Sequence, residues 1–502
     1  MSASSYPKSL TRRAFFGATA LLATLPRAPF ATPAGARWPT VVNDLHSRLN
    51  PTRVAAVEQP SSVGELRHLV RAAASNDTEI SLAGGRHAMG GQQFRTGSLL
   101  IDMSALHRVL SFDRAAGVVE VEGGIQWPEL VAWLAREQQG ERPAWGIVQK
   151  QTGADRLSIG GALSANVHGR GLVYRPIIQD VESLVLMGPD GTEKHCSREH
   201  NAELFSLAIG GYGLFGPIVS VRLRLARRHK VERIVELLDV DDVVAAFEQR
   251  IAAGFEFGDF QFATDENDAS FLRRGVFSCY RPVPDDVPLP ATRAELSEAD
   301  WTRLAYLAHT DRKRAFDTYA GFYLSTSGQL YWSDTHQMSY YRDDYHTVLS
   351  QQLGESHSSS EMISEIFVPR AALAGFMGAA SDLLRDASVP LIYGTVRLIE
   401  RDSESYLAWA RQPWACIVFN LHVDHTEAGI QRAQGAFLRL IDAALERGGS
   451  YYLTYHRWAR RDQVEAAHPR LASFLRRKRR YDPQERFQSD WYRHYRNMFA
   501  GA

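Results

Sequence analysis

Two glycine-rich segments constrain this chain more than any other feature. Each follows an apolar run that is typical of a β-strand. Their glycines leave backbone N–H groups uncovered, and such fixed dipoles hold negative charge without a counter-ion. Both loops therefore suit a diphosphate joined to a flat ring. The first contains Ala83, Gly84, Gly85, Arg86, His87, Ala88, Gly91 and Gln92, and the second contains Ser158, Gly160, Gly161, Ala165, His168 and Gly169.

Two other nucleotide-binding patterns do not fit the sequence. A Rossmann site needs a strand, GxGxxG and then a helix, with an acidic residue about twenty positions later. Arg, His and Ala follow Gly85, and no helical pattern begins at Gly91. A GxxxxGK[ST] loop does not occur either. A nicotinamide site of the Rossmann type and a P-loop are therefore not expected.

Composition excludes a further class of partner. The 502 residues are enough for two or three domains, and 45% of them are hydrophobic. Lys plus Arg and Asp plus Glu both number 57, so no basic excess favours nucleic acid as the main partner. We interpret the basic run 476–480 as the solvated end of a helix, with an anionic ligand as the alternative.

The three cysteines do not indicate a metal site. Cys196, Cys279 and Cys416 form no CxxC pair and have no zinc-site spacing, so buried free thiols are expected.

The N-terminus resembles a signal peptide of the twin-arginine type over residues 1–36. Arg12 and Arg13 precede an apolar stretch at 18–25, which is too short to span a membrane. An ordinary secretory signal is the alternative. No later segment reaches about 18 apolar residues. We therefore expect a periplasmic or secreted protein without stable membrane insertion, exported after it has taken up its cofactor.

The remaining chain divides into three predicted parts: residues 37–230, 231–450 and 451–502. In the first, Ser62 and Glu65 form a capping box for a helix that ends near Ala74. The first part also shows strand patterns at 79–83, 99–103, 118–122, 181–187 and 218–225, and a helical pattern at 127–136. The second part shows helical patterns at 240–253 and 371–387, a strand at 415–423 and a loop-rich stretch at 265–314.

Taken together, the loops resemble those of the vanillyl-alcohol oxidase superfamily, whose members carry a PCMH-type FAD-binding domain. The segment 210–218, with Gly216 and Ile218, resembles the family's stretch beside the adenine, and Tyr481-Asp482-Pro483 resembles its closing segment. The resemblance implies an α+β fold: a two-lobed FAD domain plus a cap domain with an antiparallel sheet flanked by helices. It also implies that both loops bind FAD, that Gly216 and Ile218 contribute, and that 451–502 returns to the FAD domain.

The resemblance also gives His87 and His168 their expected roles. His87 lies where many members attach the flavin to a histidine, so a covalent bond is expected, and contact with phosphate without a bond is the alternative. His168 is expected to be a structural hydrogen-bonding partner near the flavin.

Candidates for the chemistry come from the weaker half of the resemblance. Arg397 matches the arginine of the Glu-x-Arg strand in aldonolactone and alditol oxidases, with Thr395 in place of the glutamate. His456 matches the histidine of a segment in those enzymes, and Tyr455 precedes it. A strand there would point one of the two into the site, where it would assist proton removal. Glu365 is expected either to face the substrate or to pair with an arginine.

No metal site is predicted from the sequence. His422 and Asp424 would share a strand face, and we interpret them as a strand end that lines the substrate pocket rather than as metal ligands.

The expected function is oxidation of a CH–OH group in a sugar, polyol or lactone by hydride transfer to the flavin, with oxygen or another molecule as electron acceptor. The alternatives are a dehydrogenase acting on a lipid-linked sugar or an amine, and a flavin-binding protein without turnover.

Overall fold

The computed structural model describes residues 40–339, 345–355 and 357–500. The expected signal segment, residues 1–36, lies outside the described residues. The predicted domain boundaries remain a prediction, because the contacts among the described residues form a single unit. Within the described residues, no helix is both long and apolar enough to cross a membrane.

A small parallel sheet supports the first glycine loop. Its strand order is β3-β5-β4, and a separate antiparallel pair, β1 and β2, lies before it in the chain. Helix α1 begins after Ser62, whose hydroxyl accepts the Glu65 N–H, as the capping pattern predicted. The bounds are β1 Thr40–Val42, β2 Thr52–Val54, β3 Ala56–Glu58, α1 Val63–Ser75, β4 Ile80–Ala83 and β5 Leu99–Asp102.

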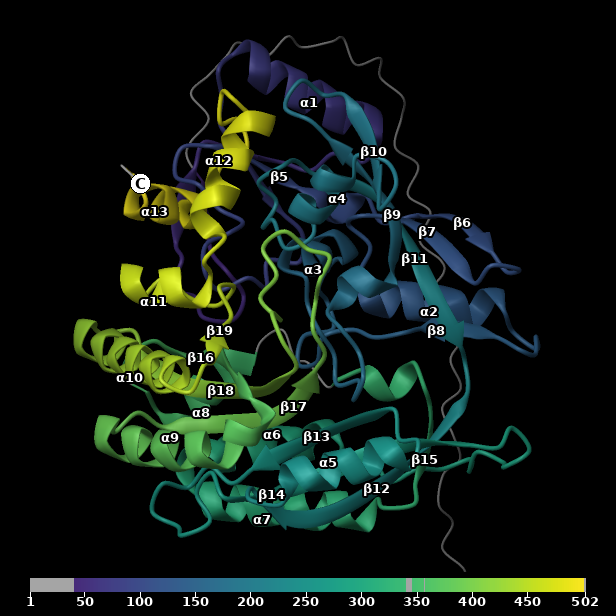
Figure 1. Cartoon of the computed structure of the whole chain (residues 1–502), viewed down its shortest axis with the longest axis vertical. Helices are drawn as coiled ribbons and strands as arrows, with labels where there is room; N and C mark the ends of the chain where they lie inside the picture. Colours follow the sequence, from purple (N-terminus) through teal and green to yellow (C-terminus); the bar gives the residue numbers. More distant parts are fainter. Residues whose placement is uncertain (1–39, 340–344, 356, 501–502) are drawn as a thin grey trace, which may run out of the picture. The chain divides into compact units, whose positions relative to one another are not determined.

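The C-terminal segment returns to this sheet, as expected. Ile80 of β4 forms a parallel bridge with Phe487, and the Ile80 N–H donates to the Arg486 carbonyl at 2.7 Å. Of the three helices of this segment, α12 and α13 lie beside the N-terminal elements in Figure 1, whereas α11 contacts the strand at 450–451. The bounds are α11 Arg461–Ala467, α12 Leu471–Tyr481 and α13 Asp490–Met498.

A six-stranded antiparallel sheet forms the second half of the N-terminal region. Its order is β10-β9-β11-β7-β6, and β8 also pairs with β11. Helices α2, α3 and α4 contribute to its hydrophobic core. The bounds are β6 Val109–Asp113, β7 Val118–Glu122, α2 Trp127–Glu137, β8 Trp145–Ile147, α3 Ile159–Ala165, β9 Val181–Met187, β10 Glu193–Ser197, α4 Ala202–Ala208 and β11 Ile218–Arg227.

The largest sheet has eight antiparallel strands in the order β15-β12-β14-β13-β17-β18-β16-β19. It confirms the expected fold class, in which an antiparallel sheet flanked by helices follows the FAD-binding domain. The bounds are β12 Lys230–Asp239, β13 Phe257–Phe262, β14 Arg274–Val283, β15 Leu330–Trp332, β16 Ser359–Pro369, β17 Leu391–Ile399, β18 Trp414–Asp424 and β19 Ser450–Tyr451.

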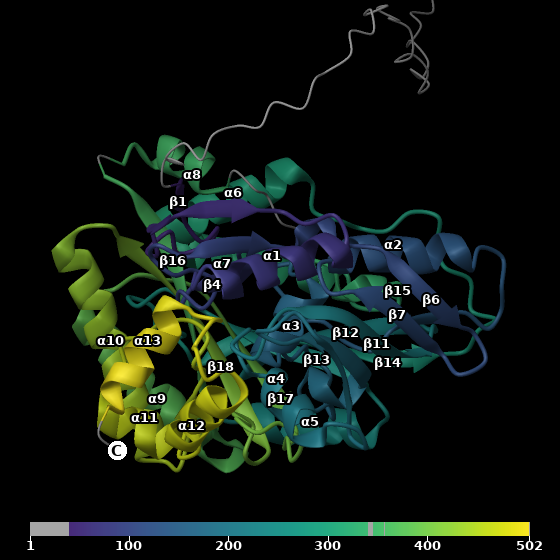
Figure 2. The ribbon, with the colours of Figure 1, turned by 90° about the horizontal axis from the view of Figure 1, so that it is seen from above.

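Helices cover the two faces of this sheet differently. Phe247 of α5 packs on Phe277, and Phe376 of α9 packs on Phe419, so these helices and α10 lie on one face. Helices α6, α7 and α8 lie toward the other face, and Figure 2 shows α6 next to α8. The bounds are α5 Val243–Ala252, α6 Glu298–Thr310, α7 Arg312–Ser325, α8 Tyr345–Leu353, α9 Leu373–Ala387 and α10 Glu427–Leu445.

Three local expectations were wrong. The stretch 265–314 is not mainly loop: it contains the buried strand β14 and the helix α6, which Ser297 and Asp300 cap reciprocally. Residues 452–460 form turns rather than a strand. In the basic run at the end of α12, Lys478 is fully buried in an ion pair with Asp482, so this helix end is only partly solvated.

Candidate active site

The two glycine loops lie against each other. The first begins where β4 ends, and α3 begins after Ser158, whose hydroxyl accepts the Gly161 N–H at 3.2 Å. A Cβ atom at Gly84 would lie 2.1 Å from Ser158 Oγ, and one at Gly85 would lie 2.3 Å from the Arg156 carbonyl oxygen. Only glycine permits this approach. The sequence assigned both loops to one site, and the structure brings them together.

The third glycine segment packs directly behind α3. The Gly160 N–H donates to the Gly123 carbonyl at 2.7 Å. A Cβ atom at Gly123 would lie 2.1 Å from the Ile218 carbonyl oxygen. Gly216 has φ +125°, and a Cβ there would lie 2.0 Å from the Met187 carbonyl oxygen. The backbone at Gly123 thus lies between Ile218 and the second loop. Whether Ile218 contacts FAD stays a prediction.

His87 is a neutral, half-buried histidine in the first loop. Its Nδ1 lies 2.8 Å from Nε2 of His46, and the preceding Arg86 adopts a left-handed backbone with φ 55°. Burial and, to a smaller extent, the neighbouring His46 together lower the pKa of His87 to about 3. A neutral imidazole can act as a nucleophile. Covalent attachment of the flavin at His87 remains a prediction.

Gln92 connects the first loop to the C-terminal segment. Its Nε2 donates to the Thr454 carbonyl at 2.7 Å, and its Oε1 accepts the Gly90 N–H at 3.0 Å. Another loop carbonyl, that of Ala88, accepts from Gln93 at 2.8 Å. The loop is therefore fixed beside the turn that carries Tyr455.

A cavity of about 800 Å³ lies next to both loops. Met89 of the first loop and Arg170, which follows Gly169, contribute to its wall. The opposite wall is one face of the eight-stranded sheet together with residues of α6, α7 and α8. The residues on that sheet face include Asp259, Gln261, Glu361, Ile363, Glu365, Tyr393, Arg397, Val418 and Asn420.

Strand register explains why these polar residues converge. Val418 of β18 is paired with Glu365 of β16 on one side and with Thr395 of β17 on the other. Cys416, two residues before it, is paired with Arg397. Paired residues share a face, and so do residues two apart along a strand. Residues distant in sequence therefore meet on the cavity side of the sheet.

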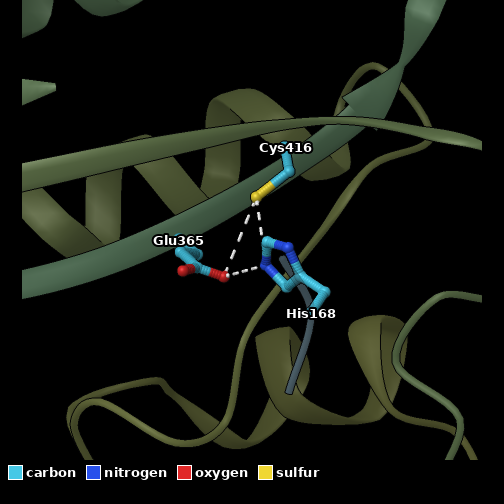
Figure 3. Close-up of side chains that lie close together, drawn as sticks. All are labelled: His168, Glu365 and Cys416. Carbon is cyan, nitrogen blue, oxygen red and sulfur yellow. Dashed lines mark hydrogen bonds and ion pairs between the residues drawn. The ribbon is translucent and has the colours of Figure 1, made fainter. Parts of the chain in front are cut away.

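Glu365 is the centre of a buried polar cluster (Figure 3). Its Oε2 lies 2.9 Å from Nε2 of His168 and 3.7 Å from Sγ of Cys416. Its Oε1 accepts the Tyr455 hydroxyl at 2.8 Å. Burial alone would raise the pKa of Glu365, but His168, Arg397 and Tyr455 together lower it overall. Glu365 is therefore an anion despite its burial.

His168 supplies a proton to this cluster. Its Nδ1 lies 3.0 Å from the Gly169 carbonyl, which can only accept a hydrogen bond. Nδ1 therefore carries a hydrogen, and the bond between Nε2 and Glu365 needs a second proton. His168 is a hydrogen-bonding partner, as expected, and it links the second loop to the sheet.

Several polar atoms on the cavity face have no hydrogen-bond partner among the described residues. They are Nε of Arg397, Oγ1 of Thr395 and Oδ1 of Asn420, and all three are buried. Buried polar atoms are rarely left unsatisfied, because each costs about 1–3 kcal/mol. The arrangement is therefore suited to a bound molecule that completes these bonds.

Tyr455 and His456 have different surroundings. Tyr455 lines the cavity, and burial beside Glu365 raises its pKa well above the usual value, so it stays a hydroxyl donor. His456 does not reach the cavity: it stacks on Phe437 and Trp458, and burial lowers its pKa to about 3. The expectation that His456 removes a proton in the site therefore has no geometric support.

Sequence reasoning missed several residues of the cavity wall. His46, Thr152 and Gly153 come from loops without a distinctive motif, and Asp259 lies on a strand that the pattern did not reveal. Glu365 was named without its role. Predicting its neighbours would have required the register of β16, β17 and β18, which cannot be recognised in a single sequence.

The two glycine loops fall within a stretch that matches a known family. Residues 54–197 match the family described as "FAD binding domain". This stretch therefore resembles a PCMH-type FAD-binding domain, as found in the vanillyl-alcohol oxidase superfamily.

Three relatives show how far the similarity extends. L-gulonolactone oxidase of Mus musculus is 30% identical over 33% of this chain and 36% of its own length. Cytokinin dehydrogenase 5 of Oryza sativa subsp. japonica is 29% identical over 36% of this chain and 34% of its own. L-gulono-1,4-lactone dehydrogenase of Mycobacterium tuberculosis is 23% identical over 88% of this chain and 95% of its own length. The chain thus spans about a third of the length of the first two.

Proposed function

We propose that this protein oxidises a CH–OH group of a small sugar-, polyol- or lactone-like substrate. The observation that carries the proposal is the anionic Glu365, which faces the cavity between Tyr455 and the buried cation Arg397. Support also comes from the lactone-oxidising relatives, one of which aligns over most of this chain.

The residues present suit FAD. Backbone without side chains lies at Gly84, Gly85 and Gly160, where any Cβ would clash with neighbouring backbone or with Ser158. Gly216, Ile218 and the second loop to Gly169 would complete this surface. Bound FAD supplies a hydride acceptor. Arg397, with its unpartnered Nε, would balance negative charge that develops in the cavity.

Proton removal is assigned to Glu365. A carboxylate within hydrogen-bond reach of a substrate hydroxyl accepts its proton as the C–H bond breaks. Tyr455 holds one carboxylate oxygen, and its high pKa prevents it from being the base itself. His168 holds the other oxygen. Glu365 therefore replaces His456 as the expected base, and Tyr455 becomes a positioning residue.

An anaerobic substrate screen tests the function. The flavin-loaded protein is mixed with aldonolactones, alditols and sugars, and bleaching of the flavin absorbance is followed. We expect a CH–OH compound to bleach it. Bleaching by amines alone would favour the dehydrogenase alternative, which the cytokinin dehydrogenase relative represents. No bleaching by any compound would support a binding protein without turnover. Recolouring in air then separates oxygen from another electron acceptor.

We propose separately a covalent bond between His87 and FAD, supported by the neutral, half-buried ring. Acid precipitation should leave the yellow colour in the pellet, and His87→Ala should release it into the supernatant. His107→Ala, at an exposed ring, is the control. Colour that stays in the pellet with His87→Ala would disprove the assignment.

Export through a twin-arginine signal is also proposed, from the residues Arg12 and Arg13 and the apolar stretch that follows. Replacing both arginines by lysine should retain the protein in the cytoplasmic fraction. Unchanged periplasmic or secreted protein would contradict this route.

A further inference from the structure

A second cluster of ligand-type side chains lies at the opposite end of the cavity face. Glu361 of β16 is surrounded by His422 of β18, His309 of α6 and His346 of α8. Glu361 and His346 line the same cavity as Glu365. Four residues along a strand separate Glu361 from Glu365, so the two clusters lie about 13 Å apart.

The ligand atoms are spaced as around one metal ion. Nε2 of His309 lies 3.0 Å from Oε1 of Glu361, and Nδ1 of His422 lies 3.8 Å from the same oxygen. Nδ1 of His346 lies 3.2 Å from Oε2. Tetrahedral ligands at zinc distances are separated by about 3.3 Å. The observed separations lie on both sides of this value.

The hydrogen bonds of the rings favour a cation between them. Nδ1 of His309 lies 2.8 Å from the Ala305 carbonyl, which can only accept, so Nδ1 carries the hydrogen. In the neutral ring, Nε2 then directs a lone pair at Glu361. Two lone pairs at 3.0 Å repel each other unless a proton or a metal ion lies between them.

The outer nitrogen of His422 is oriented in the way that metal-bound histidines usually are. Its Nε2 lies 3.5 Å from Glu355 and 3.9 Å from Asp424, so a carboxylate can accept its N–H while Nδ1 faces Glu361. Such outer carboxylates and carbonyls fix the tautomer of a metal ligand. Nδ1 of His422 has no hydrogen-bond partner among the described residues.

Protons alone account less well for this cluster. Protonating all three rings would place three positive charges around one buried carboxylate, which burial disfavours. The Glu365 cluster differs, because Tyr455 and His168 already satisfy both of its oxygens. The sequence favoured a pocket-lining strand end at His422 and Asp424. The packing of α6 and α8 adds the two histidines that the motif lacked.

We propose that His309, His346, His422 and Glu361 bind one divalent transition-metal ion of the zinc class. Imidazole and carboxylate ligands suit such an ion, whereas Mg²⁺ prefers oxygen ligands. Glu361 and His346 border the cavity, so a water molecule or an oxygen atom of the cavity's occupant would complete the coordination. The site goes beyond the proposed redox function and joins α6 and α8 to the sheet.

Metal content and competition with a chromogenic chelator test the proposal on the full, flavin-loaded chain. After chelator treatment and incubation with Zn²⁺, we expect about one zinc ion per chain. After the same treatment and incubation with Mg²⁺, we expect no bound magnesium. His422→Ala and Glu361→Gln should each weaken zinc binding at least about tenfold. His107→Ala and Glu129→Gln form the matched control, because this exposed His–Glu pair is 3.2 Å apart.

Two further readouts keep the test independent of turnover and of folding in the variants. X-ray absorption of the zinc-loaded wild type should show imidazole scattering, and Zn²⁺ should raise its midpoint of thermal unfolding. Bleaching of the flavin absorbance by a CH–OH substrate, recorded in parallel, tests the redox proposal separately from zinc binding. Zinc well below one equivalent, absence of imidazole scattering, or equal zinc affinity in the site variants and the wild type would overturn the proposal.

Discussion

The first glycine loop and strand β16 present polar groups by opposite means. The loop uses backbone, so its function depends on residues that lack side chains, and these are consecutive in the sequence. Strand β16 uses side chains. The pKa of Glu365 is lowered by His168, Arg397 and Tyr455, which lie far away in the chain. Neighbouring residues in the sequence thus specify a backbone site, whereas the pairing of distant strands specifies a side-chain site.

The two regions also differ in how charge is handled. In the loop, burial keeps His87 neutral, and its pKa falls to about 3. On β16, three neighbours keep Glu365 ionised against the effect of burial. Neutral groups suit a covalent or packing role, and the buried anion suits proton transfer. Variants in each region should therefore fail in different ways: loss of flavin from the loop, and slow flavin reduction from the strand.

The largest effect is expected from Glu365→Gln. The amide keeps the volume but cannot accept the substrate proton, so flavin reduction should slow by about 100-fold or more. Stopped-flow reduction by a substrate from the screen measures this, and flavin content should not change. Glu203→Gln is the control, because Glu203 also accepts a tyrosine hydroxyl at 2.8 Å, from Tyr481, but at the surface. Equal rates for Glu365→Gln and the wild type would remove Glu365 from the mechanism.

A smaller effect, of the opposite kind, is expected from Gly84→Val. The valine side chain would collide with Ser158 and distort the loop. If this distortion raises the free energy of FAD binding by more than about 1.4 kcal/mol, FAD affinity falls more than tenfold. Flavin per chain, read from absorbance, should fall, while the remaining loaded fraction is reduced at the normal rate. Gly375→Ala, at a helical glycine with open space around it, is the control. Full flavin content in Gly84→Val would show that the loops are not the binding surface.

The same contrast determines what the sequence could predict. The helix after Ser62, the strands that lead into both loops and the approach of the loops to one another all follow from local patterns. The fold class followed from these patterns and the family resemblance. β14 was missed, because its long apolar run lies beside a proline-rich loop that dominated the local composition.

The catalytic wall could be predicted only in part. Arg397 and His456 were included by resemblance, and Tyr455 as the neighbour of His456. Residues 452–460 form turns rather than a strand, and Tyr455 lines the cavity whereas His456 does not. The pairing that places Glu365 beside Arg397, and the helices that bring His309 and His346 to Glu361, depend on long-range packing. Such packing has no period or spacing in the sequence that could be recognised.

Tyr455→Phe tests how the anion is maintained. Loss of one hydrogen bond to a charged group should slow flavin reduction roughly tenfold. The pKa of Glu365 is lowered from 4.5, so the wild-type rate should fall only when the pH drops below that value. Removing the Tyr455 hydroxyl raises this pKa, and the acidic limb should move to higher pH. A pH–rate profile measures the shift. An unmoved limb would mean that Tyr455 does not stabilise the carboxylate.

The smallest effects compare the two regions directly through their helix caps. Ser62 accepts the Glu65 N–H at 3.2 Å in α1, and Thr426 accepts the Gly429 N–H at 3.0 Å in α10. Replacing either by alanine should lower the free energy of unfolding by about 1 kcal/mol, because one N–H of each helix loses its partner. Denaturant unfolding measures both. If the regions unfold as one cooperative unit, each variant shifts the same transition by a similar amount, without loss of flavin beforehand. Two separate transitions, each moved by one variant alone, would instead show that the glycine-loop region and the eight-stranded sheet are stabilised independently.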